Sequence, residues 1–100
     1  MIQATLASVN DVPDFLSENS LKITNTIVQV IGNTYKTRKK SALILELTLM
    51  DANGVFEISL PRSEWEKSLE NCLKVYSETE MYDEAIDTFS LLEKIRENGK

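Results

Sequence analysis

Residues 41–61 read SALILELTLMDANGVFEISLP, in which two apolar runs flank the dipeptide Asn53-Gly54. Asn-Gly favours the positive φ values of a type I′ turn, whose twist suits a β-hairpin with a two-residue loop. That turn places Leu49 opposite Ile58 and gathers the apolar side chains on one face of the hairpin. The face expected to meet the core carries Leu43, Leu45, Leu47, Leu49, Phe56, Ile58 and Leu60.

A three-residue loop within Asp51–Gly54 is the competing turn, and it shifts the strand register by one residue. Successive side chains of a strand point to opposite faces, so this shift would place Glu57 and Ser59 on the leucine face. Because that arrangement mixes polar and apolar side chains, the pattern favours the two-residue turn.

Residues 21–31, LKITNTIVQVI, are rich in β-branched side chains and predict a strand before the hairpin. The alternation of apolar and polar residues is imperfect in this stretch, so its register stays open. Residues 2–7, IQATLA, suggest a further strand, and residues 11–19, DVPDFLSEN, predict one short helix with Pro13 in its first turn.

After Pro61 the apolar period changes from two residues to 3.6, which is typical of a helix. Ser63 and Glu66 have the spacing of a capping box, in which each side chain bonds a free backbone N–H group at the helix start. We expect the first helix to span about residues 63–76. Its apolar stripe, expected to pack in the core, consists of Trp65, Leu69, Cys72, Leu73 and Tyr76.

Farther along, the apolar residues lie on nearly the opposite side of a continuous helix. One straight helix cannot bury both sides in one core, so we predict a break near 77–79 and a second helix over about 80–96. Ser77 and Glu80 have the spacing of a second capping box. An unbroken helix is the alternative and would imply oligomerisation. The second apolar group consists of Met81, Ala85, Ile86, Phe89 and Leu92.

The C-terminal third carries aromatic and small residues at spacings that match one repeat motif, namely Tyr76, Tyr82, Ala85 and Phe89. Residues 66–99 resemble a single tetratricopeptide-repeat helix pair, although Leu73 and Glu80 stand where that repeat usually has glycine. The resemblance implies a helical hairpin. It implies no function, because one unit cannot make a solenoid.

One hundred residues correspond to one domain, here residues 1–100, with a modest core. The strand and helix patterns predict an α+β fold in which an antiparallel sheet of three or four strands, over about 21–60, has a C-terminal pair of helices packed on one face. We expect no membrane segment and no signal peptide, and therefore a cytoplasmic protein.

The chain has no histidine and one cysteine, Cys72. Zinc and copper sites draw mainly on His and Cys, and Ser-His-Asp or Cys-His catalysis needs a histidine base. A lone cysteine cannot form an internal disulfide, which agrees with a reducing compartment. The composition therefore predicts a protein that is not an enzyme and has no cofactor or metal. Cys72 is expected to be a buried structural thiol.

Positive charge concentrates in residues 35–40, YKTRKK, although the formal net charge of the chain is −5. Tyr35, Lys36, Arg38, Lys39 and Lys40 are the candidate binding residues of this stretch, which lies at or near a hairpin end. Three roles are open for it: a solvated loop that guards a sheet edge, a contact with an acidic protein, or a contact with nucleic acid in which Tyr35 stacks on a base.

Negative charge concentrates between residues 75 and 90, which contain five carboxylates and no basic residue. Four of them share one helix face in the expected second helix and form a second candidate binding surface: Glu80, Asp83, Glu84 and Asp87. A solvated helix face is the alternative role. A calcium site is not expected, because the sequence DANG matches only part of a calcium-binding loop.

Together these features predict a small acidic protein-interaction module that acts by binding, as an inhibitor, adaptor or accessory subunit. Another protein is the expected partner. The alternatives are a nucleic-acid-binding accessory protein that uses residues 35–40, and a self-assembling structural subunit if the C-terminal helix is unbroken.

Overall fold

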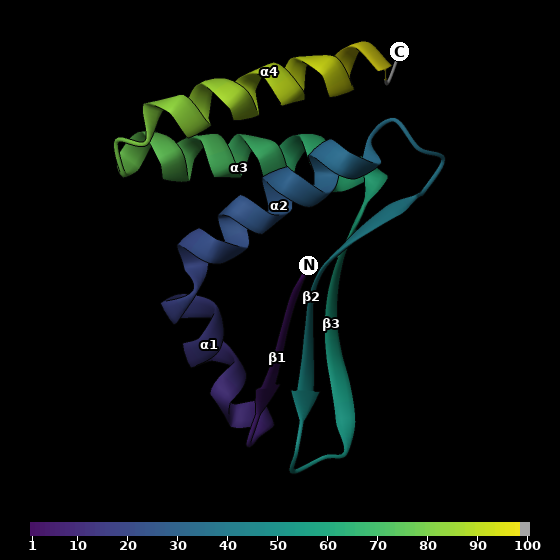
Figure 1. The fold of residues 1–100 in the computed structure, drawn as a ribbon, viewed down its shortest axis with the longest axis vertical. Coiled ribbons are helices and arrows are strands. Elements are labelled where there is room, and N and C mark those ends of the chain that lie inside the picture. The colour runs from purple at the N-terminus through teal and green to yellow at the C-terminus, as the bar shows by residue number, and fades with distance from the viewer. Residues whose placement is uncertain (99–100) are drawn as a thin grey trace.

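The computed structural model describes residues 1–98 and shows an α+β fold with one three-stranded sheet (Figure 1). Two short 3-10 segments precede helices, at Val9–Asp11 and Arg62–Glu64. The strands and helices in chain order are β1 (Ile2–Leu6), α1 (Val12–Glu18), α2 (Ser20–Thr34), β2 (Ser41–Leu49), β3 (Gly54–Pro61), α3 (Trp65–Glu78) and α4 (Tyr82–Asn98).

The sheet is mixed rather than antiparallel, with strand order β1-β2-β3. β1 pairs with β2 in parallel, with Ile2 opposite Leu45 and Leu6 opposite Leu49, whereas β2 and β3 are antiparallel. A parallel pair needs a long crossover connection, and α1 and α2 supply it. The predictions of an N-terminal strand and of a short helix with Pro13 in its first turn are confirmed.

The prediction of a strand over 21–31 is wrong, because these residues lie inside helix α2. Ile23, Ile27 and Ile31 are spaced four apart and lie on the side that packs against the core, with Ile31 fully buried. Strand propensity is weak compared with tertiary packing, and here the packing of this apolar stripe decides the structure. The imperfect alternation of the stretch was the signal that it was not a strand.

The predicted two-residue hairpin turn is also wrong. Leu49 pairs with Gly54, so the loop comprises the four residues between them. Of these four, only Asn53 has a positive φ, of 48°. The N–H groups of Met50 and Asp51 donate to the carbonyls of Leu6 and Ala7, at 3.0 and 3.1 Å. The chain therefore continues alongside the end of β1 before it turns, which lengthens the loop.

The predicted hairpin face survives this correction. Leu47 lies opposite Phe56 instead of Leu60, a shift by an even number of residues, and such a shift leaves each side chain on its face. Leu45, Leu47 and Leu49 are buried, and Phe56, Ile58 and Leu60 are half-buried against the core. The prediction is wrong for Leu43, which lies opposite Ser59 and outside the core cluster. A β-bulge between Leu43 and Leu45 additionally buries Ala42 and Ile44, which the alternation did not predict.

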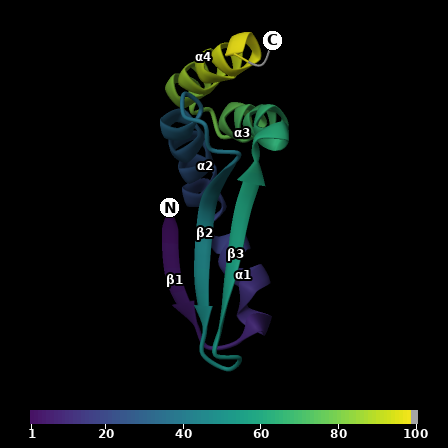
Figure 2. The same cartoon turned by 90° about the vertical axis from the view of Figure 1, so that its right-hand side faces the viewer.

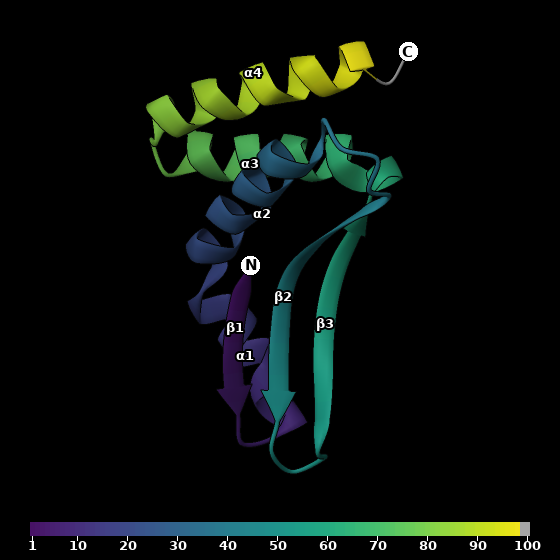
Figure 3. The ribbon, with the colours of Figure 1, turned by 45° about the vertical axis from the view of Figure 1, so that its right-hand side comes forward.

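The helices form two groups around the sheet. α1 and α2 lie along one face of the sheet, while α3 and α4 lie across its end and not over the face, contrary to expectation (Figures 1 and 2). α3 packs against α2, and α4 packs against α3 on the outside of the molecule (Figure 3). Trp65 and Leu69 connect α3 to the core that the sheet and α2 share.

The predicted break in the C-terminal helix is confirmed, and the alternative of one continuous helix is wrong. α3 ends at Glu78, α4 begins at Tyr82, and Glu80 between them has φ of 58°. The C-terminal helical hairpin is therefore present (Figure 1).

Neither predicted capping box forms. A 3-10 turn delays the start of α3 to Trp65, and no side chain caps that helix. The carboxylate of Glu66 instead accepts a hydrogen bond from Arg96 on α4. Ser77 lies in the last turn of α3, where its backbone carbonyl accepts the N–H of Glu80 at 3.3 Å.

Candidate functional site: a clamped basic loop and an exposed helix face

Residues 35–40, hereafter the basic loop, connect α2 to β2. Thr37 organises the start of the loop, because its backbone N–H and its hydroxyl both donate to the Thr34 carbonyl at the end of α2, at 2.9 and 2.7 Å. The Thr37 hydroxyl oxygen also accepts the Lys39 N–H at 3.2 Å. The backbone therefore turns back on itself directly after the helix.

The side chain of Arg62, the residue after β3, binds the backbone of the basic loop. Its guanidinium group donates four hydrogen bonds to three loop carbonyls: to Tyr35 at 3.1 Å, to Thr37 at 2.8 Å and to Lys39 at 3.1 and 2.6 Å. Its backbone N–H donates to the Lys40 carbonyl at 2.7 Å. The planar fork of several donors in arginine suits such a cluster of carbonyls.

Arg62 is itself supported by Trp65 in the first turn of α3. The guanidinium carbon lies 4.3 Å from the centroid of the Trp65 ring, and the Trp65 indole N–H donates to the Leu60 carbonyl at 2.8 Å. A guanidinium group stacks favourably on an aromatic face. Sequence reasoning missed Arg62, since nothing local shows that a residue after β3 binds a loop more than twenty positions earlier.

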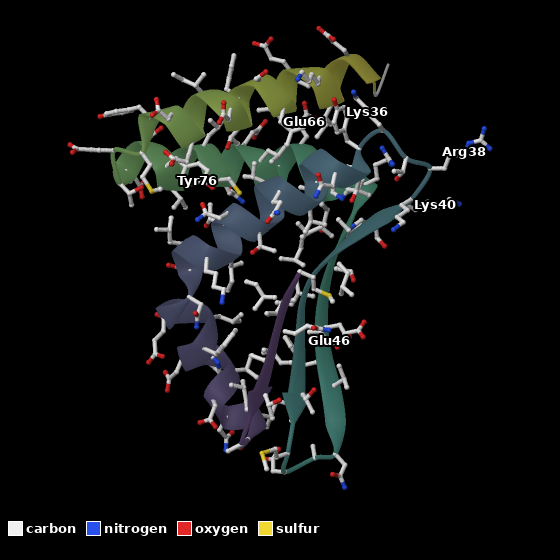
Figure 4. The ribbon with its side chains drawn as sticks, viewed as in Figure 1. Lys36, Arg38, Lys40, Glu46, Glu66 and Tyr76 are labelled. Atoms are coloured by element: carbon white, nitrogen blue, oxygen red, sulfur yellow. The ribbon has the colours of Figure 1, made fainter. Side chains whose placement is uncertain are left out.

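The cationic side chains of the loop, Lys36, Arg38, Lys39 and Lys40, are all exposed. Figure 4 shows Arg38 at the tip of the loop, where it points away from the body of the molecule. Tyr35 differs from them, because it is half-buried against the core and the Lys36 ammonium lies 5.7 Å from its ring centroid. The basic loop thus presents four positive charges on a backbone held by Arg62, with Tyr35 as its anchor.

The four predicted acidic residues are all exposed, and Asp83, Glu84 and Asp87 lie in the first turns of α4. Glu80 lies in the turn before the helix, so the prediction that all four share one helix face is wrong. Within residues 1–98, no three His, Cys, Asp or Glu side chains are grouped so that they could hold a metal ion. The basic loop adjoins the N-terminal end of α3, whereas these carboxylates adjoin its C-terminal end. A helix of 14 residues separates the two surfaces by about 20 Å, so the structure does not bring them into one site.

α4 exposes Ile86 and Phe89, which belong to the predicted apolar group, and also Tyr82, which does not. Tyr82, Ile86 and Phe89, hereafter the α4 stripe, are 62%, 66% and 49% exposed. The buried side of α4 instead carries Thr88 and Leu92, and the Thr88 hydroxyl donates to the Glu84 carbonyl at 2.7 Å. The predicted apolar side is therefore correct for Leu92, which is buried, and for Met81 and Ala85, which are half-buried, but wrong for Ile86 and Phe89.

Cys72 is buried, as predicted, on the side of α3 that faces α2. Its thiol sulfur lies 3.9 Å from the Thr24 carbonyl, and burial raises the pKa of the thiol to about 11. The reactive form of cysteine is the thiolate, which is scarce at neutral pH for such a group. One helical turn later, the Tyr76 hydroxyl donates to the Asn25 side-chain oxygen at 2.5 Å.

Among residues 1–98, no helix has the length and apolar character needed to cross a membrane. The chain matches no protein family model, no curated protein and no solved structure.

Proposed function

We propose that this chain is a small protein-interaction module that acts by binding, as an inhibitor, adaptor or accessory subunit. The observation that carries the proposal is the basic loop, whose four exposed cations stand on a backbone held by Arg62 through four side-chain hydrogen bonds. The partner surface is acidic, and it belongs to another protein.

Two physical effects favour a binding role for such a loop. Ordering a flexible loop on binding lowers affinity, and a loop that is already ordered avoids much of that cost. A compact group of positive charges also steers an acidic partner and raises the association rate. An edge guard of a sheet needs exposed charge but no internal clamp, so the clamp by Arg62 supports recognition over edge protection.

The proposal includes no catalytic role and no cofactor. It is supported by the absence of histidine from the sequence and by the burial of the Cys72 thiol with its raised pKa. We also propose a cytoplasmic location, which rests on the single cysteine and so on the lack of any internal disulfide.

A protein partner is favoured over nucleic acid for two reasons. Tyr35 is half-buried, so its ring is not free to stack on a base as the nucleic-acid reading requires. The net charge of −5 also repels a polyanion. The reading as a self-assembling subunit depended on an unbroken C-terminal helix, and the break between α3 and α4 removes that premise.

The test begins with capture of partners from the native host by tagged protein, followed by mass spectrometry and binding kinetics with the purified partner. The loop variant is Lys36→Gln, Arg38→Gln, Lys39→Gln and Lys40→Gln together. Its matched control changes four exposed lysines elsewhere, which alters the net charge by the same amount: Lys22→Gln, Lys67→Gln, Lys74→Gln and Lys94→Gln.

We expect the loop variant to slow association with the partner at low salt, by about tenfold or more, and this effect to fade as salt rises. The control variant should change the rate far less. Arg62→Lys should weaken binding while net charge stays constant, because lysine cannot make the same forked set of hydrogen bonds.

Equal effects of the loop and control variants would contradict the proposal, as would wild-type association by the loop variant. If the captured partner is nucleic acid, the slope of log affinity against log salt should flatten in the loop variant. That result would identify nucleic acid, and not a protein, as the partner of the basic loop.

A further inference from the structure

The α4 stripe is a second candidate surface that the basic loop does not explain. α4 is the outermost element of the fold and packs against α3 through Thr88 and Leu92 (Figure 3). Tyr82, Ile86 and Phe89 stand at spacings of four and three residues, so they form one continuous row along the helix. Three large exposed apolar residues in one row are unusual for a helix of this length, since such side chains normally form the buried side.

Tyr82 and Phe89 lie beside α3, whereas Ile86, two residues before the buried Thr88, faces nearly the opposite way into solvent. Tyr82, Phe89 and Arg96 are seven residues apart and therefore lie on the same side of the helix. Arg96 reaches across to α3, where it donates to the carboxylates of Glu66 and Glu70. One side of the stripe, formed by Tyr82 and Phe89, consequently borders the junction of the two helices, and Ile86 extends it away from α3.

Negative charge borders the stripe on one side. Asp83 and Asp87 directly follow Tyr82 and Ile86, and both carboxylates are exposed. No lysine or arginine occurs between residues 75 and 90, which contain the whole stripe. The surface is therefore an apolar row inside a negative electrostatic field, and the complementary surface is an apolar row flanked by lysine or arginine.

We propose that the α4 stripe docks a basic amphipathic helix of a partner protein. This inference rests on the proposed function as an interaction module, and it assigns a second surface and a second partner chemistry to it. Helix recognition uses apolar residues at i, i+3 or i+4, and i+7, which is the spacing of the stripe itself. The stripe spans about 10 Å, or two helical turns. Tyrosine and phenylalanine are also residue types that are enriched at interfaces.

A second copy of this chain fits the stripe poorly. Two α4 stripes facing each other would bring Asp83 and Asp87 of both copies together, and like charges across an interface are unfavourable. No helix within residues 1–98 offers the complementary pattern either. α1 has no basic residue and α2 has only Lys22. α3 has Lys67 and Lys74, but its apolar row is buried in the same chain. α4 has Lys94 and Arg96, and Arg96 is already engaged with α3.

Synthetic peptides of about 18 residues, or five helical turns, provide the probe. The first peptide has leucine in one helical row and lysine at the remaining positions, and it carries a fluorescent dye. The second keeps the leucine row and replaces every lysine by glutamate. The third keeps the lysines and replaces every leucine by alanine. Binding to the full-length protein is measured by fluorescence anisotropy at low and high salt.

We expect the leucine–lysine peptide to bind at least tenfold more tightly than either of the other two peptides. Ile86→Ser and Phe89→Ser should each weaken this binding by about tenfold, as expected for residues in the centre of an interface. The side chains of Ile86 and Phe89 are 66% and 49% exposed, so their replacement should leave the fold intact. Circular dichroism with thermal melting checks that the variants stay folded. Val55→Ser changes an exposed apolar residue on β3 and serves as the matched control.

The charge component has its own matched pair of variants. Asp83→Asn with Asp87→Asn should weaken binding of the leucine–lysine peptide severalfold at low salt, and this effect should disappear at high salt. Asp14→Asn with Glu18→Gln removes two exposed carboxylates on α1 and changes the net charge equally. This control should bind the peptide nearly as well as the wild type.

The inference is overturned if the glutamate peptide binds as well as the lysine peptide, or if the α1 control weakens binding as much as the α4 variant. It is also overturned if sedimentation shows a dimer that Ile86→Ser dissociates, because the occupant is then a second copy. The quadruple variant of the basic loop should leave peptide binding unchanged. Failure of the peptide experiment would therefore contradict the proposal for the α4 stripe but not the proposal for the basic loop. Failure of the loop experiment would likewise not contradict the proposal for the α4 stripe.

Discussion

α3 and α4 are antiparallel neighbours of similar length, with 14 and 17 residues, yet they use their apolar side chains in opposite ways. α3 buries Trp65, Leu69, Cys72 and Tyr76 almost completely, against the core that the sheet and α2 share and against α2 itself. α4 exposes its row of three large apolar residues and buries only Thr88 and Leu92 among its described residues. Position in the fold explains the difference, because α3 lies between α2 and α4, whereas α4 is the outermost element and one of its sides faces solvent.

This comparison shows that an apolar row on a helix indicates an interface, but it does not say with which partner. For α3 the partner is the interior of the same chain. For α4 the helix has two apolar sides, and one of them has no cover within the described structure. The same residue types therefore serve stability in α3 and are available for binding in α4.

The largest expected effect comes from a pair of aromatic truncations. Trp65→Ala should reduce the free energy of unfolding by about 3–5 kcal/mol, because it empties a fully buried site, whereas Phe89→Ala should stay within about 0.5 kcal/mol. Urea denaturation monitored by circular dichroism measures both. If Trp65→Ala does not fold, Trp65→Phe gives the same ranking. Equal losses of unfolding free energy in the two variants would contradict the difference between α3 and α4.

Leu47 in β2 should behave like the buried side of α3, since it belongs to the same core cluster as Trp65. Leu47→Ala should cost about 2–5 kcal/mol. The control, Thr48→Ala, lies on the opposite and exposed face of β2 and should cost less than about 1 kcal/mol. A loss below about 0.5 kcal/mol for Leu47→Ala in denaturant melts would contradict the assignment of the core face.

The burial of the Cys72 thiol on α3 should make the free energy of unfolding depend on pH. Its pKa rises from the ordinary value of 9.0 to about 11 in the folded protein, because burial disfavours the thiolate. Between these values the unfolded chain loses the proton and the folded chain keeps it, so stability falls as pH rises. The loss cannot exceed about 3 kcal/mol, since each pKa unit corresponds to about 1.4 kcal/mol.

Urea melts at pH 8, 9.5 and 11 test this expectation against Cys72→Ala, which lacks the titrating group. The two proteins should show a constant difference up to pH 9, and the wild type should then lose more stability than the variant. Thiol labelling of the native wild type should also be slow and should accelerate on unfolding. Parallel pH profiles through pH 11, or rapid native labelling, would show that the thiol is accessible.

The smallest expected effect concerns the contact between α3 and α4. Arg96→Gln removes the hydrogen-bonded ion pairs with Glu66 and Glu70, which are exposed and therefore contribute little. The melting temperature should fall slightly at low salt and match the wild type in about 1 M salt, where charges are screened beyond about 3 Å. Lys94→Gln, an exposed change on the same helix, is the control. A large loss from Arg96→Gln would mean that charge rather than packing fixes α4 on α3.

The sequence alone determined the shared face of the hairpin from Leu45 to Leu60, because strand side chains alternate and a shift by an even number of residues preserves the faces. The β-bulge at Leu43 is the exception. It also determined the break between the C-terminal helices and the burial of Cys72, since both follow from the phase of an apolar stripe with a 3.6-residue period. At the candidate site it determined the composition and exposure of the basic loop, because a run of four cations in six residues is costly to bury.

The tertiary structure alone decided the features that depend on partners far away in the chain. Residues 21–31 are helical because α2 buries Ile23, Ile27 and Ile31, and the hairpin loop is long because the Leu6 and Ala7 carbonyls bind the chain after β2. Likewise, Arg62 clamps the basic loop, and α3 covers only one of the two apolar sides of α4. A local pattern specifies the period and direction of side chains, whereas the partner that each side chain meets is selected by the free energy of packing the whole chain.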